Sequence, residues 1–219
     1  MIHIKKICKS FGKINLLKDI DLTINPGEKI SLIGPGSCGK TTLIKILLGL
    51  CPPDSGTSTL FNVNIFKIDD ALKEKIYKKV GIAFQQSALF DFQTIEENLS
   101  FTMQHMTHKT PIEIDKKIDE LLSAIKLPHA RKLYPHELSG GMKKRVGIAR
   151  ALSTNPKIAF FDEPTSGLDP VTSTIILNMI KNLSSNNEDS IMVTATSNVE
   201  IAIRFSNRVV LMRDGKIIA

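Results

Sequence analysis

Short runs of apolar and β-branched residues recur along this chain of 219 residues. Such a run, about four to eight residues long and bounded by turn residues, is typical of a buried strand. We expect strands at Ile20–Ile24, Ile30–Ile33, Val80–Phe84, Ile158–Phe161, Ile191–Thr194 and Val209–Met212, and a first strand in Met1–Lys6. Asn25–Glu28 and Arg213–Lys216 are turn sequences, and the second predicts a hairpin.

Helical patterns separate several of these strands, which predicts an α/β fold with a largely parallel sheet. Between residues 94 and 154 the pattern is almost wholly helical, and it is broken by Pro128 and Pro135. The candidate helices are Thr94–His105, Pro111–Lys126 and Ser139–Ser153. We therefore predict an α/β core at 1–90 and 154–219 and an inserted helical subdomain at 91–153. A short polar loop is expected at Ser184–Ser190.

Composition and charge narrow the class of protein. Hydrophobic residues make up 42% of the chain, enough for a sizeable core, and no apolar run reaches the ~18 residues that a membrane span needs. A net charge of +7 suits an anionic partner such as nucleic acid or a membrane surface. Aromatic residues are only 5%, so no base-stacking platform is evident and no nucleic-acid partner is expected. Most of the charge, including Lys143, Lys144 and Arg145, is expected to be solvated surface.

The cysteines and the N-terminus indicate the compartment. Cys8, Cys38 and Cys51 are odd in number and lack metal-site spacing, which favours a reducing cytosol. The N-terminus lacks the long apolar region of a signal peptide. We therefore expect a cytoplasmic protein.

Residues 34–41 carry the most informative motif. Gly34-Pro35-Gly36-Ser37-Cys38-Gly39-Lys40-Thr41 has the form GxxxxGK[ST], and Thr42 follows it. Such a P-loop wraps backbone N–H groups around nucleotide phosphates. Lys40 supplies a charge for the β- and γ-phosphates, and the Thr41 hydroxyl can bind Mg²⁺. An apolar strand precedes the loop and a helical pattern follows it, so a helix N-terminus points at the phosphates. The alternative is a glycine-rich turn that binds nothing.

Within this loop Cys38 has two interpretations. Its thiol is acidified and reactive among the N–H groups, or it is a small residue in a small space.

Two further motifs indicate nucleotide chemistry. Asp162 and Glu163 end an apolar strand in the Walker B pattern, where Asp162 can hold the Mg²⁺ shell and Glu163 can polarise an attacking water. The stretch Leu138–Met142, with sequence LSGGM, precedes a helix, so Ser139 and the glycines form a second anion site. One nucleotide does not need two such sites, and the second is best explained as serving a neighbouring subunit. The alternatives are an ordinary acidic pair and an ordinary helix cap.

The P-loop, Gln85, LSGGM, the two acids and Ser166–Asp169 together resemble the nucleotide-binding subunit of ATP-binding cassette (ABC) transporters over essentially the whole chain. The resemblance implies a P-loop NTPase core with an antiparallel β portion. It also implies a head-to-tail homodimer that sandwiches two ATP molecules with Mg²⁺, each between one P-loop and the other subunit's Ser139 and Gly141. A transmembrane permease would complete the transporter, with this subunit peripheral on the inner face of the cell membrane.

The resemblance gives roles to single residues. Phe11 takes the position of an adenine-stacking aromatic, with core packing as the alternative. Gln85, or the adjacent Gln86, takes the position of a glutamine that contacts Mg²⁺ and the transmembrane partner. Asp169 takes the position of an aspartate that links the two sites across the dimer.

A finer resemblance concerns the substrate. Phe84–Asp91 and LSGGM look like the phospholipid-trafficking branch of the maintenance-of-lipid-asymmetry type, which implies a lipid substrate and a lipid-binding partner protein. The apolar residues Leu89, Phe90 and Phe92 are expected to dock the permease, with packing against the helical insertion as the alternative.

One position departs from the family pattern. Where the family has a histidine that holds the γ-phosphate and the attacking water, this chain has Ser197, and no histidine occurs after His136. A serine hydroxyl is shorter than imidazole and cannot carry a positive charge. The ATPase motor of a transporter, favoured by Glu163, therefore competes with an ATP-gated dimerisation module that hydrolyses little, favoured by Ser197. Ser197, Asn198 or a water performing the histidine's task is a further alternative.

An ABC ATPase of nucleic-acid repair or translation is less favoured, because the chain has neither a long coiled-coil insertion nor a second cassette. Relatives commonly run beyond the position of Ala219, so a C-terminal tail is expected to be absent here.

Overall fold

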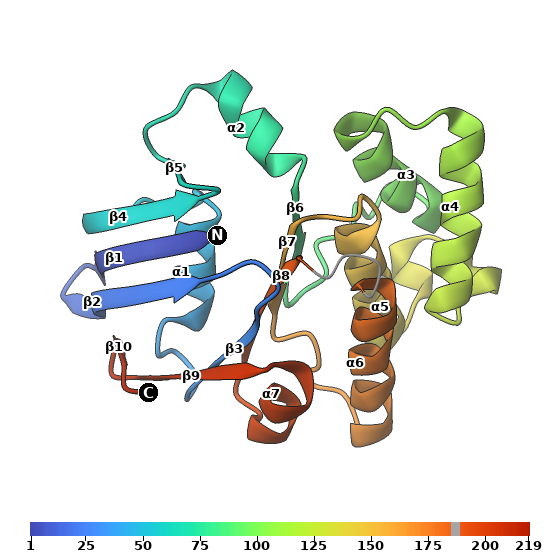
Figure 1. Ribbon diagram of the computed structural model, residues 1–219. Helices are drawn as coiled ribbons and strands as arrows, with labels where there is room; N and C mark the ends of the chain where they lie inside the picture. Colours follow the sequence, from blue (N-terminus) through green and yellow to red (C-terminus); the bar gives the residue numbers. More distant parts are fainter. Residues whose placement is uncertain (185–188) are drawn as a thin grey trace. The chain divides into compact units, whose positions relative to one another are not determined.

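The computed structural model describes residues 1–184 and 189–219 of the chain (Figure 1). The chain divides into two compact units, Met1–Ile76 with Asp189–Ala219, and Tyr77–Glu188. These boundaries differ from the predicted core and insertion, and that division stays a prediction. The loop expected at Ser184–Ser190 falls mostly outside the described residues. None of the helices in the described ranges is long and apolar enough to cross a membrane.

The first unit contains an antiparallel sheet in the order β2-β1-β4-β5. Its strands are β1 (Ile2–Phe11), β2 (Ile14–Ile24), β4 (Ser55–Leu60) and β5 (Val63–Asn64). Ile2 of β1 is opposite Ile24 on one side and Leu60 on the other, and all three are fully buried. These cross-strand apolar pairs fix the register, because a slip by one residue would turn them to solvent.

A second group of strands in this unit has the order β10-β9-β3-β8. Its members are β3 (Lys29–Ile33), β8 (Ile191–Thr196), β9 (Arg208–Arg213) and β10 (Lys216–Ile217). β3 pairs in parallel with β8 and β9, and β10 turns back on β9 in the predicted hairpin. The helices of this part are α1 (Lys40–Leu47) and α7 (Val199–Phe205), while α2 (Asp70–Tyr77) reaches the boundary of the unit. Every residue of β8 is buried, as expected for a parallel strand that is covered on both faces.

In its described residues, the second unit combines two parallel strands with four helices. β6 (Val80–Ala83) pairs with β7 (Ile158–Asp162), and the helices are α3 (Ile95–Met106), α4 (Pro111–Ala124), α5 (Gly140–Leu152) and α6 (Pro170–Ser184). Two 3₁₀ turns, Pro128–Ala130 and Pro135–Glu137, occupy the two proline interruptions. α5 packs directly on β6, because a Cβ added at Gly81 would lie 2.1 Å from the Ala151 carbonyl oxygen.

Side chains cap the three predicted helices of this unit at their N-termini. Thr94 and Thr110 each form a reciprocal capping box with a glutamate three residues later, and Ser139 accepts a hydrogen bond from the Met142 N–H. These caps explain why α3, α4 and α5 begin within one residue of the predicted positions.

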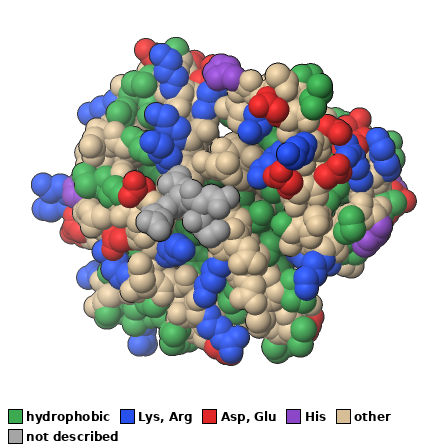
Figure 2. All heavy atoms as spheres, turned by 45° about the vertical axis from the view of Figure 1, so that its right-hand side comes forward, with side chains coloured by type: hydrophobic (Ala, Val, Ile, Leu, Met, Phe, Trp, Pro, Cys, Tyr) green, Lys and Arg blue, Asp and Glu red, His purple; other side chains and the backbone are tan. Residues whose placement is uncertain are grey.

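An ion-pair network joins α3 and α4. The guanidinium of Arg131 binds Glu96 of α3 at 2.7 Å and also contacts Asp115 and Asp119 of α4, while Lys132 contacts Glu96. Burial alone would raise the pKa of Glu96, but the hydrogen bonds from Lys132 and Arg131 outweigh it and lower the pKa. Figure 2 shows acidic and basic side chains side by side on the right of the view.

Candidate functional site

The P-loop connects β3 to α1 in the first unit. Ser37 has φ of 61° and Gly39 has φ of 103°, so two residues of the loop lie in the left-handed region. Among the described residues, none accepts a hydrogen bond from the backbone N–H groups of Gly36, Ser37, Cys38 or Gly39. Successive N–H groups with this geometry form a concave site for an anion. The loop is therefore shaped to hold phosphate.

The three glycines of the loop serve different purposes. A Cβ at Gly34 would lie 2.2 Å from the Met212 carbonyl oxygen, and one at Gly39 would lie 2.5 Å from Cδ2 of Leu17. A Cβ at Gly36 would meet nothing within 4 Å. The fold therefore requires glycine at 34 and 39, whereas at 36 the missing side chain leaves open space beside the N–H groups, where a phosphate fits.

Lys40 is held inside its own loop. Its Nζ donates to the carbonyl oxygens of Gly34 at 2.8 Å and Pro35 at 3.1 Å, and the residue is 6% exposed. The loop thus holds the ammonium close to its own N–H groups. Thr41 and Thr42 follow in the first turn of α1 and are half-buried.

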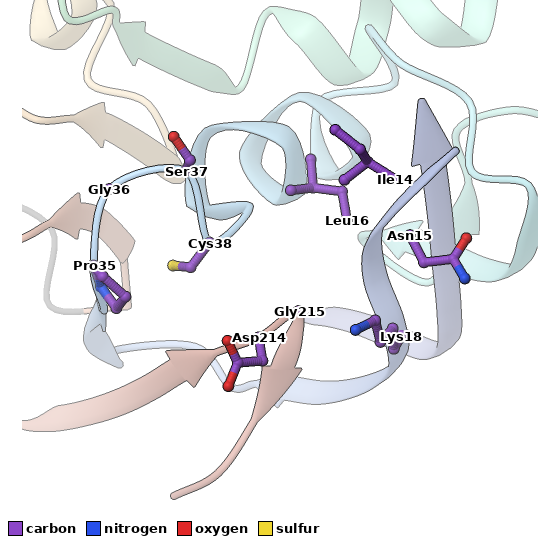
Figure 3. Close-up of a pocket in the computed structure, with 10 residues that line it drawn as sticks. All are labelled: Ile14, Asn15, Leu16, Lys18, Pro35, Gly36, Ser37, Cys38, Asp214 and Gly215. Atoms are coloured by element: carbon purple, nitrogen blue, oxygen red, sulfur yellow. The ribbon is translucent and has the colours of Figure 1, made fainter. Parts of the chain in front are cut away.

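A pocket of about 240 Å³ borders the P-loop. Figure 3 shows Pro35, Gly36, Ser37 and Cys38 on one side, Ile14, Asn15, Leu16 and Lys18 on another, and Asp214 and Gly215 of the β9–β10 hairpin below. Cys38 is 7% exposed, and its Sγ lies 2.8 Å from the position a Cβ at Gly34 would take. The close fit supports the interpretation of Cys38 as a small residue in a small space.

Phe11 ends β1 and leaves 53% of its surface exposed. The alternative that it packs in the core is therefore wrong. The ammonium of Lys9 lies 5.3 Å from the centroid of the Phe11 ring and 2.9 Å from Asp54. An exposed ring of this kind can stack on a flat aromatic ligand.

Ser197 leaves the sheet beside the P-loop. In the parallel pair of β3 and β8, Ile33 is opposite Thr196, so Gly34 and Ser197 follow at the same edge. Ser197 is exposed, whereas the Asn198 side chain caps α7 by accepting from the Ile201 N–H at 3.1 Å. Asn198 is thus already used in holding a helix, which weakens the alternative that it replaces the histidine.

The acidic pair lies in the second unit, at the end of β7. Asp162 is 4% exposed and Glu163 is half-buried. Glu163 has φ of 46°, a left-handed conformation that costs a non-glycine residue about 1–2 kcal/mol. Such strain persists only where the surroundings hold it, and it is common at functional positions.

Lys144 is one of the groups that hold this strained residue. Its Nζ donates to the Glu163 carbonyl oxygen at 3.3 Å, to the Ser166 hydroxyl at 3.1 Å and to the Ser166 carbonyl oxygen. Burial lowers the pKa of Lys144, and the charge of Glu163 opposes that shift. Lys143, Lys144 and Arg145 are exceptions to the expectation that most of the charge is solvated surface: all three are half-buried, and Arg145 donates to the Ile125 carbonyl oxygen at 2.8 Å.

The N-terminus of α5 forms the second predicted anion site. Ser139 is exposed and caps the helix, a Cβ at Gly140 would meet nothing within 4 Å, and one at Gly141 would have its closest contact, Leu168, at 3.5 Å. The space beside the two glycines of the first turn is therefore open, which leaves room for an anion at this helix N-terminus.

Asp169 starts α6. Its carboxylate accepts from the Thr172 N–H at 2.9 Å and from the Thr172 hydroxyl at 2.6 Å, and these bonds lower its pKa. Both carboxylate oxygens of Asp169 are thus used in capping α6. The family resemblance had assigned this residue to a link between the two ATP sites of the dimer.

Gln85 and Gln86 follow β6 and are both exposed, so the structure does not separate the two candidates. Because Ala83 is opposite Phe161, this loop and the acidic pair leave the same edge of the β6–β7 pair.

The residues after these glutamines are fixed by two side chains that sequence analysis did not identify. Asn98 of α3 is fully buried and bonds the N–H and carbonyl of Phe90, at 2.8 and 3.1 Å, and the carbonyls of residues 93 and 94. Arg150 of α5 donates to the carbonyls of Ser87 at 3.0 Å and Ala88 at 2.8 Å. A polar residue on the apolar face of a predicted helix was the available signal for Asn98.

An apolar surface continues from this loop. Phe92 is 78% exposed and lies 5.9 Å, centroid to centroid, from Phe90, which in turn lies 5.1 Å from Phe101. Phe92 is thus not buried against the insertion, and its ring is available to a partner.

The donors also fit a nucleotide-bound Mg²⁺. The described residues contain no cluster of three or more His, Cys, Asp or Glu that could hold a metal ion by themselves. Each unit contains ligand types that suit Mg²⁺, which takes most of its ligands from phosphates and water. The first unit has a hydroxyl (Thr41), and the second has a buried carboxylate (Asp162) and an amide (Gln85).

Sequence comparison assigns the family. The pattern of the family described as "ABC transporter" matches residues 17–166. The chain is 37% identical to the arginine transport ATP-binding protein ArtM of Bacillus subtilis, over all of its own length and 90% of that protein. It is 36% identical to the sulfate/thiosulfate import protein CysA of Pectobacterium atrosepticum, over 99% of its length and 64% of that protein. The chain thus spans most of the first relative but under two thirds of the second.

Structural comparison agrees. The dimeric, post-hydrolysis structure of the ATP-binding cassette MJ0796 with ADP and Pi is 32% identical, with a TM-score of 0.91, over all of this chain and 97% of that one. This likeness confirms the predicted α/β P-loop NTPase fold with its mixed sheet, antiparallel portion and helical subdomain. The chain therefore belongs to the ABC transporter family, in which it is an ATP-binding subunit that hydrolyses ATP with Mg²⁺.

Proposed function

We propose that the chain works as a head-to-tail homodimer with two ATP molecules between the subunits, and that hydrolysis drives a membrane permease. The observation that carries this proposal is that the chain has two candidate anion sites, one in each unit. One is the P-loop with its N–H groups around Gly36, and the other is the open N-terminus of α5 at Ser139. The dimeric structures of MJ0796 support it, since they match the whole of this chain.

Each residue of the site has a proposed task. Lys40 and the P-loop N–H groups bind the phosphates, and Phe11 stacks on the base. Ser139 and Gly141 bind the phosphates held by the other subunit. Glu163 takes a proton from the attacking water. When bound, Mg²⁺ would neutralise charge on the β- and γ-phosphates, with Thr41, Asp162 and Gln85 as its protein ligands.

A second candidate is an ATP-gated dimerisation module with little hydrolysis. Ser197 favours it, because it lies at the P-loop edge of the sheet and is too short to do the work of an imidazole. In this case ATP would still close the dimer, and opening would depend on slow turnover.

The transported solute is left open. The relatives carry names of arginine transport and of methionine, cystine and sulfate import at 35–37% identity, so identity at this level does not select a substrate. They give no support to a lipid substrate or to a lipid-binding partner. We propose only that Phe92 and its aromatic neighbours dock the permease, with the subunit on the inner face of the cell membrane.

Trapping the dimer tests the proposal. Glu163→Gln keeps the shape of the side chain but removes the charge, so ATP should persist between subunits and light scattering should report a dimer. Ser139→Arg in the same background should prevent the dimer by filling the second anion site. Ser123→Arg, at an exposed serine of α4, is the matched control and should leave the dimer intact. A Glu163→Gln protein that stays monomeric at saturating ATP would refute the sandwich.

A further inference from the structure

A single lysine of α5 contacts the turn that follows the acidic pair. Lys144 has three hydrogen-bond donors, and three acceptors surround them: the carbonyl oxygens of Glu163 and Ser166 and the hydroxyl of Ser166. All of these groups belong to the second unit. The ammonium is thus fully engaged by one short segment of backbone, rather than by a carboxylate on the surface.

The contacted segment is a tight turn. The Ser166 N–H donates to the Glu163 carbonyl oxygen at 3.2 Å, and Lys144 donates to the same oxygen at 3.3 Å. Pro164 lies between them and has a fixed φ. Glu163 itself is in the left-handed region, and so its peptide can relax to an ordinary conformation if these bonds are lost. Such a relaxation would turn the Glu163 side chain in another direction.

The neighbouring lysine shows that this contact is specific. Lys143 precedes Lys144 on the same helix, yet within the described parts of the chain its side chain has no hydrogen bond or ion pair. Both lysines are half-buried, so burial alone does not bring a lysine of this helix to the turn. The placement of Lys144 is explained by the three acceptors that its ammonium meets there.

We propose that Lys144 is a positioning residue for ATP hydrolysis, which holds the Glu163 peptide so that the carboxylate faces the attacking water. The inference rests on the proposed role of Glu163 as the base. The proposal also gives α5 a second task. Ser139 at its N-terminus would bind one ATP of the dimer, and Lys144, five residues later, would position Glu163, which acts on the other ATP. Seating of an anion at the α5 N-terminus would then stabilise the working conformation of Glu163.

Single-turnover ATP hydrolysis at saturating ATP and Mg²⁺ tests the proposal with five variants of the full chain. Lys144→Met removes the donors, Lys144→Arg keeps a cation with several donors, and Lys143→Met is the matched control. Glu163→Gln and the double variant Lys144→Met/Glu163→Gln test whether the lysine acts through the acid. Equilibrium ATP binding and thermal unfolding are measured on each protein.

We expect Lys144→Met to lower the rate by about 10- to 100-fold, since an error of about 1 Å in a catalytic group has this effect, with ATP affinity within about twofold of wild type. Lys144→Arg should recover most of the rate, and Lys143→Met should match wild type. In the Glu163→Gln background, Lys144→Met should cause no further loss.

The outcomes separate this inference from the proposed function. An unchanged rate in Glu163→Gln would show that Glu163 is not the base, and would refute both the proposed function of Glu163 and the positioning role of Lys144. A slow Glu163→Gln with a normal Lys144→Met would overturn the positioning role alone. So would an equal further loss in the double variant, which would mean that Lys144 acts on stability or binding instead. If Lys144→Met does not fold, Ser166→Ala, which removes one acceptor, must lower the rate without lowering ATP affinity, or the inference is wrong.

Discussion

Replacing Ser197 with histidine should speed ATP hydrolysis. The residue is exposed and leaves β8 next to the point where β3 enters the P-loop, because Ile33 and Thr196 are paired. An imidazole there needs no repacking of the core. Its Nε2 extends further than a serine hydroxyl, and it can donate a hydrogen bond to the γ-phosphate or to the attacking water.

The size of the gain follows from how well the imidazole is placed. A well-placed acid–base group contributes about 10²–10⁴-fold, and an error of about 1 Å can forfeit about 10²-fold. Asn198, the residue after Ser197, is fixed because its side chain caps α7. The backbone at residue 197 therefore cannot adjust freely to the new side chain. We therefore expect a gain of about 10-fold, equivalent to about 1.4 kcal/mol of barrier.

Single-turnover kinetics at saturating ATP measure the chemical step apart from binding. Val199→His is the matched control, since Val199 is 56% exposed and lies two residues further on, in the first turn of α7. It should leave the rate unchanged. If Ser197→His is no faster than wild type, or if wild type already turns over at about 1 s⁻¹ or more, Ser197 is not a defect and other residues perform the histidine's task.

Three further predictions address binding, docking and stability. Lys40→Ala should weaken ATP binding, measured by calorimetry, by about 1.5–3 kcal/mol, or roughly 10- to 150-fold. Lys45→Ala, at an exposed position of α1, is the control and should leave the affinity unchanged. Equal affinities for Lys40→Ala and wild type would refute the role of Lys40 in phosphate binding. Phe92→Asp should reduce co-purification with the permease and leave ATP affinity intact, with the exposed Ile112→Asp as its control, and an unchanged yield would count against the contact. The pKa of Glu96 is lowered in the folded state, so its ionised form adds stability that is lost as the pH falls below 4.5, the ordinary pKa of the group. Glu96→Gln should therefore make the free energy of unfolding decline less steeply in acid. An equally steep decline in this variant would show that Glu96 is not a source of the acid sensitivity.

The strands that sequence patterns predicted are those with continuous apolar runs. β3, β7 and β8 are buried along nearly their whole length, so hydrophobicity alone reveals them. β4 has the sequence Ser-Gly-Thr-Ser-Thr-Leu and is half exposed, so its pairing with neighbouring strands, above all with β1, makes it a strand. A pairing between residues so distant in sequence cannot be read from a local pattern.

The candidate site divides in the same way. The P-loop and the acidic pair are local motifs, and their positions at strand ends follow from the sequence. Lys144 stands in a run of three basic residues that all look solvated, and only the fold distinguishes it from Lys143. The capping role of Asp169 depends on where α6 begins, which the sequence alone did not determine.

The loop after Gln85 is too firmly bonded to bend alone. Asn98 attaches it to α3 and Arg150 attaches it to α5, through hydrogen bonds to at least five of its backbone groups. A push on Phe92 would therefore displace these helices rather than reshape the loop. The loop would then move as a rigid unit with α3 and α5. A displacement at the permease and a movement of Ser139 at the start of α5 would therefore occur together. The rate of that displacement would then be set by nucleotide chemistry, because no slow refolding of a flexible linker would separate the nucleotide site from the permease contact.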